Sequence, residues 1–526
     1  MLFNSYLFLL IFLPIALAGH YLAGAISLRL AAIWLCFTSF VFYGWWNPTF
    51  VALLAASIAF NYLTSLVILY FKNNKRSQTW ATAIGIAINL AVLIHYKYFA
   101  ALFNFLGEWG LTAGNMHELI LPLGISFFTF TQIGYLVDCR SGVVKEKSLL
   151  SYVLFVTFFP HLIAGPILHH NEMMPQFAKA ENYRFSWESL SIGGVLFTIG
   201  LAKKVLLADE IAPYADAGFA ETGNLQFWAA WGGSISYALQ LYFDFSGYSD
   251  MALGLARMFG IRFPLNFNSP YKAGSIIEFW ARWHMTLTRY LTAYLYYPVA
   301  MAVSRAREKR GLTVGSNAAH SPGGFAVTIA LPTIFTMGLA GIWHGAGLQY
   351  LVFGLLHAFY LCVNHAWRIF YVYKKPAHLR KPGRLGHVLG VAVTFTAVLI
   401  GQAFFRAHGV GDAWLLVQGM AGLRGFESAQ TLSYIAGLPI GDAVRLIIGH
   451  HLQWFWIVLL LGIAWLAPNA HEIMGKYSPA MFKIKEASPA WMRWRPTWGW
   501  TVATLVLLFI CLVNLHKETR FLYFQF

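Results

Sequence analysis

Charge and cysteine are what this sequence has least of. Of its 526 residues only 11% are charged, whereas 58% are hydrophobic and the mean hydropathy is +0.58. Soluble domains carry about 25% charged residues, so a string of ordinary soluble domains is excluded. The four cysteines form no C-x-x-C motif and no zinc-ligand spacing with histidine, and we expect free, packed thiols. They are Cys36, Cys139, Cys362 and Cys511.

Several catalytic signatures are also missing. The chain has no G-x-x-x-x-G-K phosphate loop and no G-x-S-x-G nucleophile elbow. It has no H-E-x-x-H metal helix, because His117-Glu118 and His471-Glu472 both lack the second histidine. No serine or cysteine is set up as a covalent nucleophile. We therefore expect no metal and no bound cofactor.

The sequence does contain a long series of apolar runs. These runs predict an all-α polytopic membrane protein with about 11–13 transmembrane helices plus re-entrant and interfacial helices. The first run lacks a basic segment before it and is long for a signal peptide, so we expect it to be retained. Residues 149–166 are short and interrupted by Pro160 and Pro166, a pattern typical of a re-entrant half-span.

The formal net charge is +16, from 37 Lys and Arg against 21 Asp and Glu. Basic residues lie in short clusters between the apolar runs, such as Arg305 to Arg310, which is the positive-inside pattern of cytoplasmic loops. No basic face with stacking aromatics can be separated from the spans, so nucleic-acid binding is not expected. Asp244 and Asp250, inside an apolar run, are expected to cap a broken helix or to pair with a basic residue.

Residues 338–360 combine a long apolar run with two ionisable side chains, His344 and His357. An ionisable residue at membrane depth needs a polar partner or a water-filled cavity. Glycine gives up helix propensity and packing, so a glycine cluster indicates a helix break or a close backbone approach. The four glycines around His344 are Gly338, Gly341, Gly345 and Gly347. We predict a histidine at a helix break that faces a passage open to substrate; a packed, neutral histidine is the alternative.

A second histidine, His284, lies in residues 261–300, where Pro264 and Pro270 indicate irregular backbone. The apolar residues that follow recur at helical spacing, which predicts an amphipathic interfacial helix or a shallow re-entrant element. Neutral imidazole, with a pKa of about 6.5, is a good general base at neutral pH. Two such rings suit deprotonation of a hydroxyl for attack on an activated acyl group. The lack of a covalent nucleophile favours direct transfer.

Seven segments give the chain a resemblance to a known family. They are MLFNSYLFLLIFLPI at 1–15, LPLGISFFTFTQIGYLVD at 121–138, FFPHLIAGPI at 158–167, LYFDFSGYSDMALGLARMFGIRFPLNFNSPY at 241–271, EFWARWHMTLTRYL at 278–291, GIWHGAG at 341–347 and FLYFQF at 521–526. Together they resemble the membrane-bound O-acyltransferase family, and within it the bacterial branch of the alginate O-acetylation membrane protein. The chain departs from that pattern at Thr292-Ala293 and in the following loop, which leaves the substrate open.

The resemblance implies one integral-membrane domain over residues 1–526. Its N-terminal helices would occupy 1–145, a core with the active-site histidines 146–372, and C-terminal helices 373–526. The histidine of the W-H-G motif, His344, would be the catalytic base. The histidine of the R-W-H-M-T-L motif would be the second catalytic histidine, His284.

Three further residues are expected to bind substrate: Arg282, Trp283 and Asn268, with packing or capping as the alternative. The implied reaction moves an acyl group, acetyl in particular, from cytoplasmic acetyl-CoA toward hydroxyls of an exported polysaccharide or cell-wall glycan. The implied setting is the lipid of a bacterial inner (plasma) membrane. A periplasmic esterase-like acetyltransferase partner and polysaccharide export machinery would complete the transfer. D-alanyl transfer to teichoic acid and a non-enzymatic transporter of polysaccharide or acyl groups are the alternatives.

Overall fold

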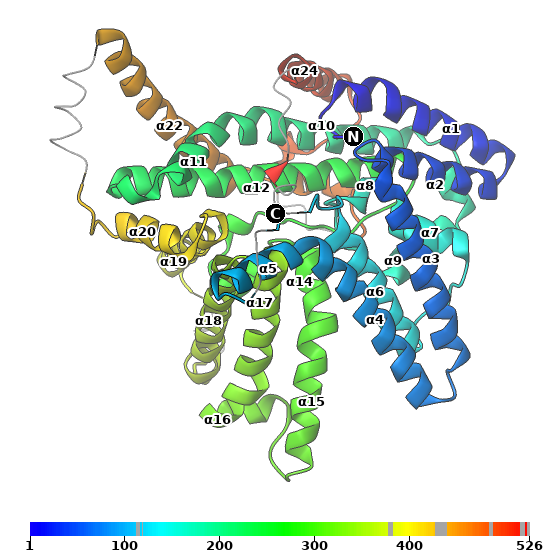
Figure 1. The fold of residues 1–526 in the computed structure, drawn as a ribbon. Coiled ribbons are helices and arrows are strands. Elements are labelled where there is room, and N and C mark those ends of the chain that lie inside the picture. Colours follow the sequence, from blue (N-terminus) through cyan, green and yellow to red (C-terminus); the bar gives the residue numbers. More distant parts are fainter. Residues whose placement is uncertain are drawn as a thin grey trace. The chain divides into compact units, whose positions relative to one another are not determined.

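The computed structural model describes the chain except for residues 112–115, 118, 377–381, 427–438, 483–487, 516–520 and 523–526. In the described residues all regular secondary structure is helical, which confirms the predicted all-α class (Figure 1). Most of the closing FLYFQF segment lies outside the described residues. The helices fall into two compact units, each built from stretches that are far apart in the sequence.

Unit 1 consists of Met1–Val205, Phe245–Leu265 and Ala470–Phe526. Within it α1 packs on α2, α3 and α4 pack on α6, and α10 packs on α24 from the other end of the chain. Its complete helices are α1 (Leu13–Ile26), α2 (Leu28–Gly44), α3 (Thr49–Tyr70), α4 (Lys75–Lys97), α5 (Phe99–Glu108), α6 (Ile125–Ser141), α7 (Leu149–Thr157), α8 (Phe159–Leu162), α9 (His170–Phe177), α10 (Trp187–Ala202), α23 (Ala470–Ile473) and α24 (Trp498–Asn514).

Unit 2 consists of Leu206–Asp244 and Asn266–Asn469. Within it α17 packs along α18, α18 packs on α19 and α13, and α11 packs on α22. Its complete helices are α11 (Asp209–Ala220), α13 (Ile276–Trp280), α14 (Met285–Leu291), α15 (Tyr297–Glu308), α16 (Pro322–Phe325), α17 (Leu331–His344), α18 (Leu348–Phe370), α19 (Arg384–Arg406), α20 (Val410–Met420) and α22 (Ile440–Leu466). The long helix α12 (Phe227–Met258) contributes residues to both units.

Six helical segments of the described chain are long and apolar enough to cross a membrane. They are Phe8–Ile26, Thr49–Tyr70, Lys75–Lys97, Trp187–Ala220, Pro322–His344 and Arg384–Arg406. Three shorter apolar helices accompany them: Leu28–Gly44, His451–Leu466 and Trp498–Asn514. The chain is therefore a multi-pass membrane protein, and the total of about 11–13 crossings stays a prediction.

The short run at 149–166 is interrupted as predicted. Helix α7 ends at Thr157, and α8 begins at Phe159 with Pro160 in its first turn. Proline has no backbone N–H and is tolerated in a first turn, where that donor has no helical partner. Residues 152 and 154–168 are buried in protein, which is the condition under which a broken helix is tolerated at membrane depth.

The two predictions for Asp244 and Asp250 have different outcomes. Helix α12 runs unbroken through both residues, so the expected helix break is wrong. Pairing with a basic residue is confirmed for Asp250, whose Oδ2 lies 2.6 Å from Lys203 Nζ. A buried carboxylate needs a partner. The Lys203 ammonium is that partner for Asp250, so no helix break is needed to supply a backbone amide.

Candidate active site

Helix α17 ends at His344, and α18 begins only four residues later at Leu348. Gly345, directly after the histidine, is extended (φ −170°) and stops the helix. The predicted helix break at His344 is therefore confirmed. The imidazole is half-buried and lies against the rings of Trp343 and Phe405, with centroid distances of 4.8 and 4.9 Å.

Two glycines let the helices of this hairpin touch. A Cβ on Gly341 would overlap the carbonyl oxygen of Tyr350 and lie 3.0 Å from Gly354 Cα, and a Cβ on Gly354 would overlap the carbonyl oxygen of Met337. Small residues at a crossing allow backbone contact in membrane helices. Gly341 and Gly354 therefore fix the position of α17, and of His344 at its end, against α18.

His357 lies on α18 and is 1% exposed. The indole Nε1–H of Trp280 donates a hydrogen bond to its Nδ1 at 3.3 Å. The ring of Phe353 stands between the two histidines of this hairpin, 6.0 Å from the His344 ring and 4.7 Å from the His357 ring. His357 is therefore a packed ring bonded to a neighbouring element, the arrangement that the sequence left open as the alternative for His344.

His284 lies in a turn and not in a helix. The expected amphipathic helix across this segment is wrong, because α13 ends at Trp280, His284 has a left-handed backbone (φ +42°), and α14 begins at Met285. The left-handed conformation costs a non-glycine residue energy and needs compensation from its surroundings. Asn266, 18 residues earlier, provides that compensation by binding the first turn of α14.

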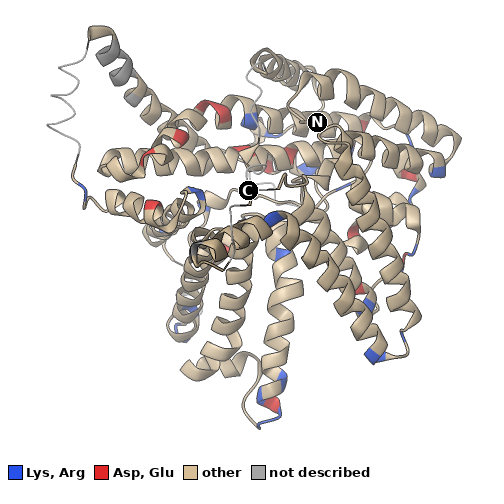
Figure 2. Ribbon diagram, viewed as in Figure 1, with Lys and Arg blue, Asp and Glu red and all other residues tan. Residues whose placement is uncertain are grey.

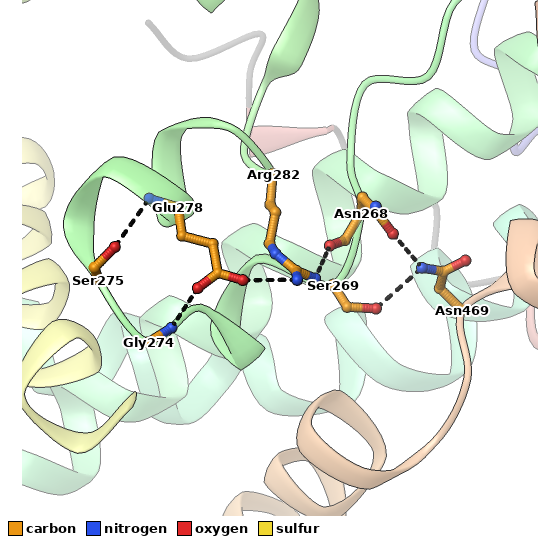
Figure 3. Close-up of polar contacts among 7 residues, drawn as sticks. All are labelled: Asn268, Ser269, Gly274, Ser275, Glu278, Arg282 and Asn469. Atoms are coloured by element: carbon orange, nitrogen blue, oxygen red, sulfur yellow. Dashed lines mark hydrogen bonds and ion pairs between the residues drawn. The ribbon is translucent and has the colours of Figure 1, made fainter. Parts of the chain in front are cut away.

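Arg282 is held in a polar network (Figure 3). Its guanidinium lies 2.7 Å from Glu278 Oε1 and donates to the backbone oxygen of Asn268 at 3.3 Å. Asn469, just past the end of α22, donates its Nδ2–H groups to Asn268 Oδ1 at 2.9 Å and to Ser269 Oγ at 3.0 Å. The Arg282 side chain is 31% exposed, so it keeps surface for a ligand while it ties the turn to α13.

Trp283 is buried among aromatic rings. It stacks on Phe279, with centroids 5.6 Å and planes 16° apart, and meets the edge of Phe267 at 5.0 Å. A ring enclosed in this way offers packing more than a recognition surface. Its role in substrate binding stays a prediction.

The five predicted site residues all belong to unit 2 and form two groups. His284, Arg282, Trp283 and Asn268 lie in the irregular segment around the α13–α14 turn, whereas His344 lies at the end of α17. A series of ring contacts with centroid distances of 4.7–6.0 Å links the two groups. The series runs Trp283, Phe279, Trp280, His357, Phe353 and His344.

Sequence reasoning missed Asn266, Trp280 and Asn469. Asn266 was interpreted only as part of the irregular backbone, and Trp280 only as one of the apolar residues at helical spacing. The partners of these side chains are between 18 and 201 positions away in the chain. Local spacing carries no signal for such pairs.

The model of the membrane-bound O-acyltransferase family matches residues 140–316, which include His284 but not His344. A peptidoglycan O-acetyltransferase of Helicobacter pylori is 38% identical over 459 residues, covering 81% of this chain and 80% of its own. A probable alginate O-acetylase of Pseudomonas aeruginosa is 31% identical over 565 residues and 100% of both chains. A teichoic acid D-alanyltransferase of Streptococcus thermophilus is 26% identical over 313 residues, 58% of this chain and 72% of its own.

Proposed function

Because the chain belongs to the membrane-bound O-acyltransferase family and is a multi-pass membrane O-acyltransferase, we propose that it transfers acetyl groups from cytoplasmic acetyl-CoA. The final acceptors are hydroxyl groups of an exported polysaccharide or a cell-wall glycan. The similar proteins of Helicobacter and Pseudomonas, named for peptidoglycan and alginate, support this class of acceptor. The membrane is the bacterial inner membrane, because the acetyl donor is cytoplasmic and the polymer is outside.

His344 is the general base of the proposed reaction. Its neutral ring takes the proton of the attacking hydroxyl, whose oxygen forms a bond to the thioester carbonyl carbon. The tetrahedral intermediate then expels the thiolate, which recovers the proton from the imidazolium to give free thiol and an acetyl ester. The observation that carries this assignment is exposure: His344 is half-buried at a helix end, whereas His284 and His357 are 2% and 1% exposed.

His284 assists in one of two ways, by positioning the donor or acceptor or by stabilising the developing negative charge. The candidates near it for contact with substrate are Arg282, Trp283 and Asn268. Arg282 has the positive charge and the exposure that suit an anionic group.

The basic tip of α15 favours an anionic donor. Figure 2 shows Lys and Arg residues at this tip, where Arg305, Lys309 and Arg310 are exposed. A cluster of positive charge attracts the phosphates of CoA and raises the local concentration of the donor. A cytoplasmic position for this loop, as its basic residues predict, is consistent with that role.

We further propose that a periplasmic esterase-like acetyltransferase receives the acetyl group outside the membrane and passes it to the polymer beside the export machinery. D-alanyl transfer to teichoic acid is the second candidate reaction. Acetyl transfer is favoured because the D-alanyltransferase is 26% identical over 58% of this chain, whereas the peptidoglycan O-acetyltransferase is 38% identical over 81%.

The proposal is tested by replacing His344 with Gln in cells and measuring O-acetyl esters on polysaccharide and peptidoglycan. We expect acetylation to fall by about 10²–10⁴-fold, the range contributed by a general base, at unchanged protein level. His320→Gln is the matched control, because His320 is exposed at the end of the short 3₁₀ helix before α16. Wild-type acetylation in the His344 variant would refute the base assignment. Absence of thioester cleavage by purified wild-type protein would favour a transporter.

A further inference from the structure

Asn266 connects the backbone and the ring of His284. Its backbone oxygen accepts the Met285 N–H at 2.9 Å, and its side-chain Oδ1 accepts the Thr286 N–H at 3.3 Å. These are the first two amides of α14, which have no partner within the helix. The same Oδ1 accepts the Thr286 hydroxyl at 2.8 Å and lies 3.0 Å from His284 Nδ1. Asn266 is 0% exposed and His284 is 2% exposed, so this arrangement is shielded from competing water.

These contacts determine which ring nitrogen of His284 carries the proton. A backbone N–H can only donate, so the Asn266 atom that it binds is the carbonyl oxygen and not the amide nitrogen. A carbonyl oxygen can only accept, so His284 Nδ1 must be the donor in their contact. A neutral imidazole has a single N–H, and the lone pair therefore lies on Nε2.

We propose that Asn266 is a positioning residue that holds His284 as the Nδ1–H tautomer, so that Nε2 accepts a hydrogen bond from an O–H or N–H group of bound substrate. This inference rests on the proposed function for the presence of a substrate. It decides between the two roles left open for His284. A neutral ring without a proton on Nε2 cannot donate to a developing oxyanion from that nitrogen, so His284 orients substrate while His344 moves the proton.

The tautomer is measured directly by solid-state NMR of the full chain, labelled with ¹³C,¹⁵N-histidine, in lipid bilayers. The ring shifts distinguish the Nδ1–H and Nε2–H forms, and His284→Gln identifies the His284 signals by their loss. We expect the Nδ1–H form in the wild type and a gain of the Nε2–H form in Asn266→Ala. An Nε2–H wild type, or an alanine variant that keeps the Nδ1–H form, would overturn the proposal.

Activity gives a second readout, with purified full-length protein, acetyl-CoA and an alginate oligosaccharide, followed by thiol release. Asn266→Ala is expected to lower kcat/KM at least tenfold, and the substrate whose KM rises is the one that donates to Nε2. Asn266→Asp keeps an acceptor for all three donors and is expected to recover activity above the alanine level. An aspartate variant no better than alanine, at equal melting temperature, counts against positioning through the acceptor.

The two proposals fail separately. A wild-type protein that shows no thiol release would contradict the proposed function, whereas a His344→Gln variant with full activity would contradict only the assignment of His344 as the base. The NMR measurement needs no turnover and decides the tautomer in either case.

Discussion

Two buried histidines in unit 2 hold opposite tautomers. His284 faces a carbonyl oxygen and must donate from Nδ1, whereas His357 faces the indole N–H of Trp280 and must accept at Nδ1. A neutral His357 ring therefore carries its proton on Nε2, the nitrogen that lies 2.6 Å from where a Cβ on Gly401 would stand. A residue on another segment determines the tautomer of each ring, Asn266 for His284 and Trp280 for His357.

Removal of the indole donor is expected to destabilise unit 2. Trp280→Phe keeps an aromatic ring at this position but replaces the indole by a smaller ring and removes the N–H whose hydrogen bond His357 Nδ1 accepts. A buried acceptor left without its donor costs about 1–3 kcal/mol. We expect a lower melting temperature for the full chain in detergent, with Trp491→Phe as control because Trp491 is 79% exposed. Equal melting of both variants would show that this hydrogen bond contributes no stability.

For single residues, the sequence predicts some of the local structure and contacts but not all of them. The helix break at His344 could be predicted because glycines surround an ionisable side chain in an apolar run. Asn268 and Arg282 were expected to bind substrate, which stays a prediction, and the structure shows that they contact each other. The turn at His284 could not be predicted, because its left-handed backbone depends on hydrogen bonds that Asn266 accepts, and no local pattern connects Asn266 to the turn.

The α17–α18 hairpin is the element that places His344. Its glycines differ in what surrounds them, although the sequence shows them as one cluster. A Cβ on Gly338 would lie 3.6 Å from Leu355, an ordinary contact, whereas one on Gly341 would overlap the backbone of α18. The glycine cluster indicates a helix break or a close backbone approach, but only the helix crossing in the structure shows which glycine is required.

Gly341→Ala is expected to inactivate the protein with little change in its amount. The added methyl must push α17 away from α18, because the atom it overlaps is backbone and cannot rotate aside. His344 moves with the end of α17, and a displacement of about 1 Å at a catalytic group can cost 10²-fold in rate. Cellular O-acetylation measures the loss.

Gly338→Ala is the matched control for this prediction, because it makes the same change three residues earlier on the same helix. We expect near-normal acetylation and slightly higher thermal stability, since alanine favours helix over glycine by about 1 kcal/mol. Similar activity in the two variants would show that the close crossing does not set the position of His344.

At the scale of the whole chain, each unit is assembled from separated stretches, and a buried cluster joins the three stretches of unit 1. Lys203 comes from the first, Asp250 from the second and His471 from the third. Asp250 Oδ2 lies 2.6 Å from Lys203 Nζ, and Oδ1 lies 2.9 Å from His471 Nε2. The apolar runs include Lys203 and Asp250 but not His471, which lies on the short helix α23. Pairing over 47 and 221 positions is a product of the tertiary fold.

Asp250→Asn tests whether this cluster holds the stretches together. Asparagine keeps the shape of the side chain but leaves the Lys203 ammonium, 15% exposed, without its counter-charge. Breaking a buried ion pair by removal of one partner costs about 3–5 kcal/mol, whereas an exposed pair contributes about 0–1 kcal/mol. We therefore expect a large fall in melting temperature for Asp250→Asn.

Glu181→Gln is the control for this comparison. It removes the carboxylate of the Lys179–Glu181 pair, whose side chains are 58% and 73% exposed, and should melt as the wild type does. His471→Gln leaves the Lys203–Asp250 pair in place and should fall between the two. The difference from Glu181→Gln follows from burial, whereas the intermediate position of His471→Gln follows from the Lys203–Asp250 pair that it leaves in place. If Asp250→Asn melted with Glu181→Gln, unit 1 would be held by its apolar packing and the buried charges would contribute nothing to its stability.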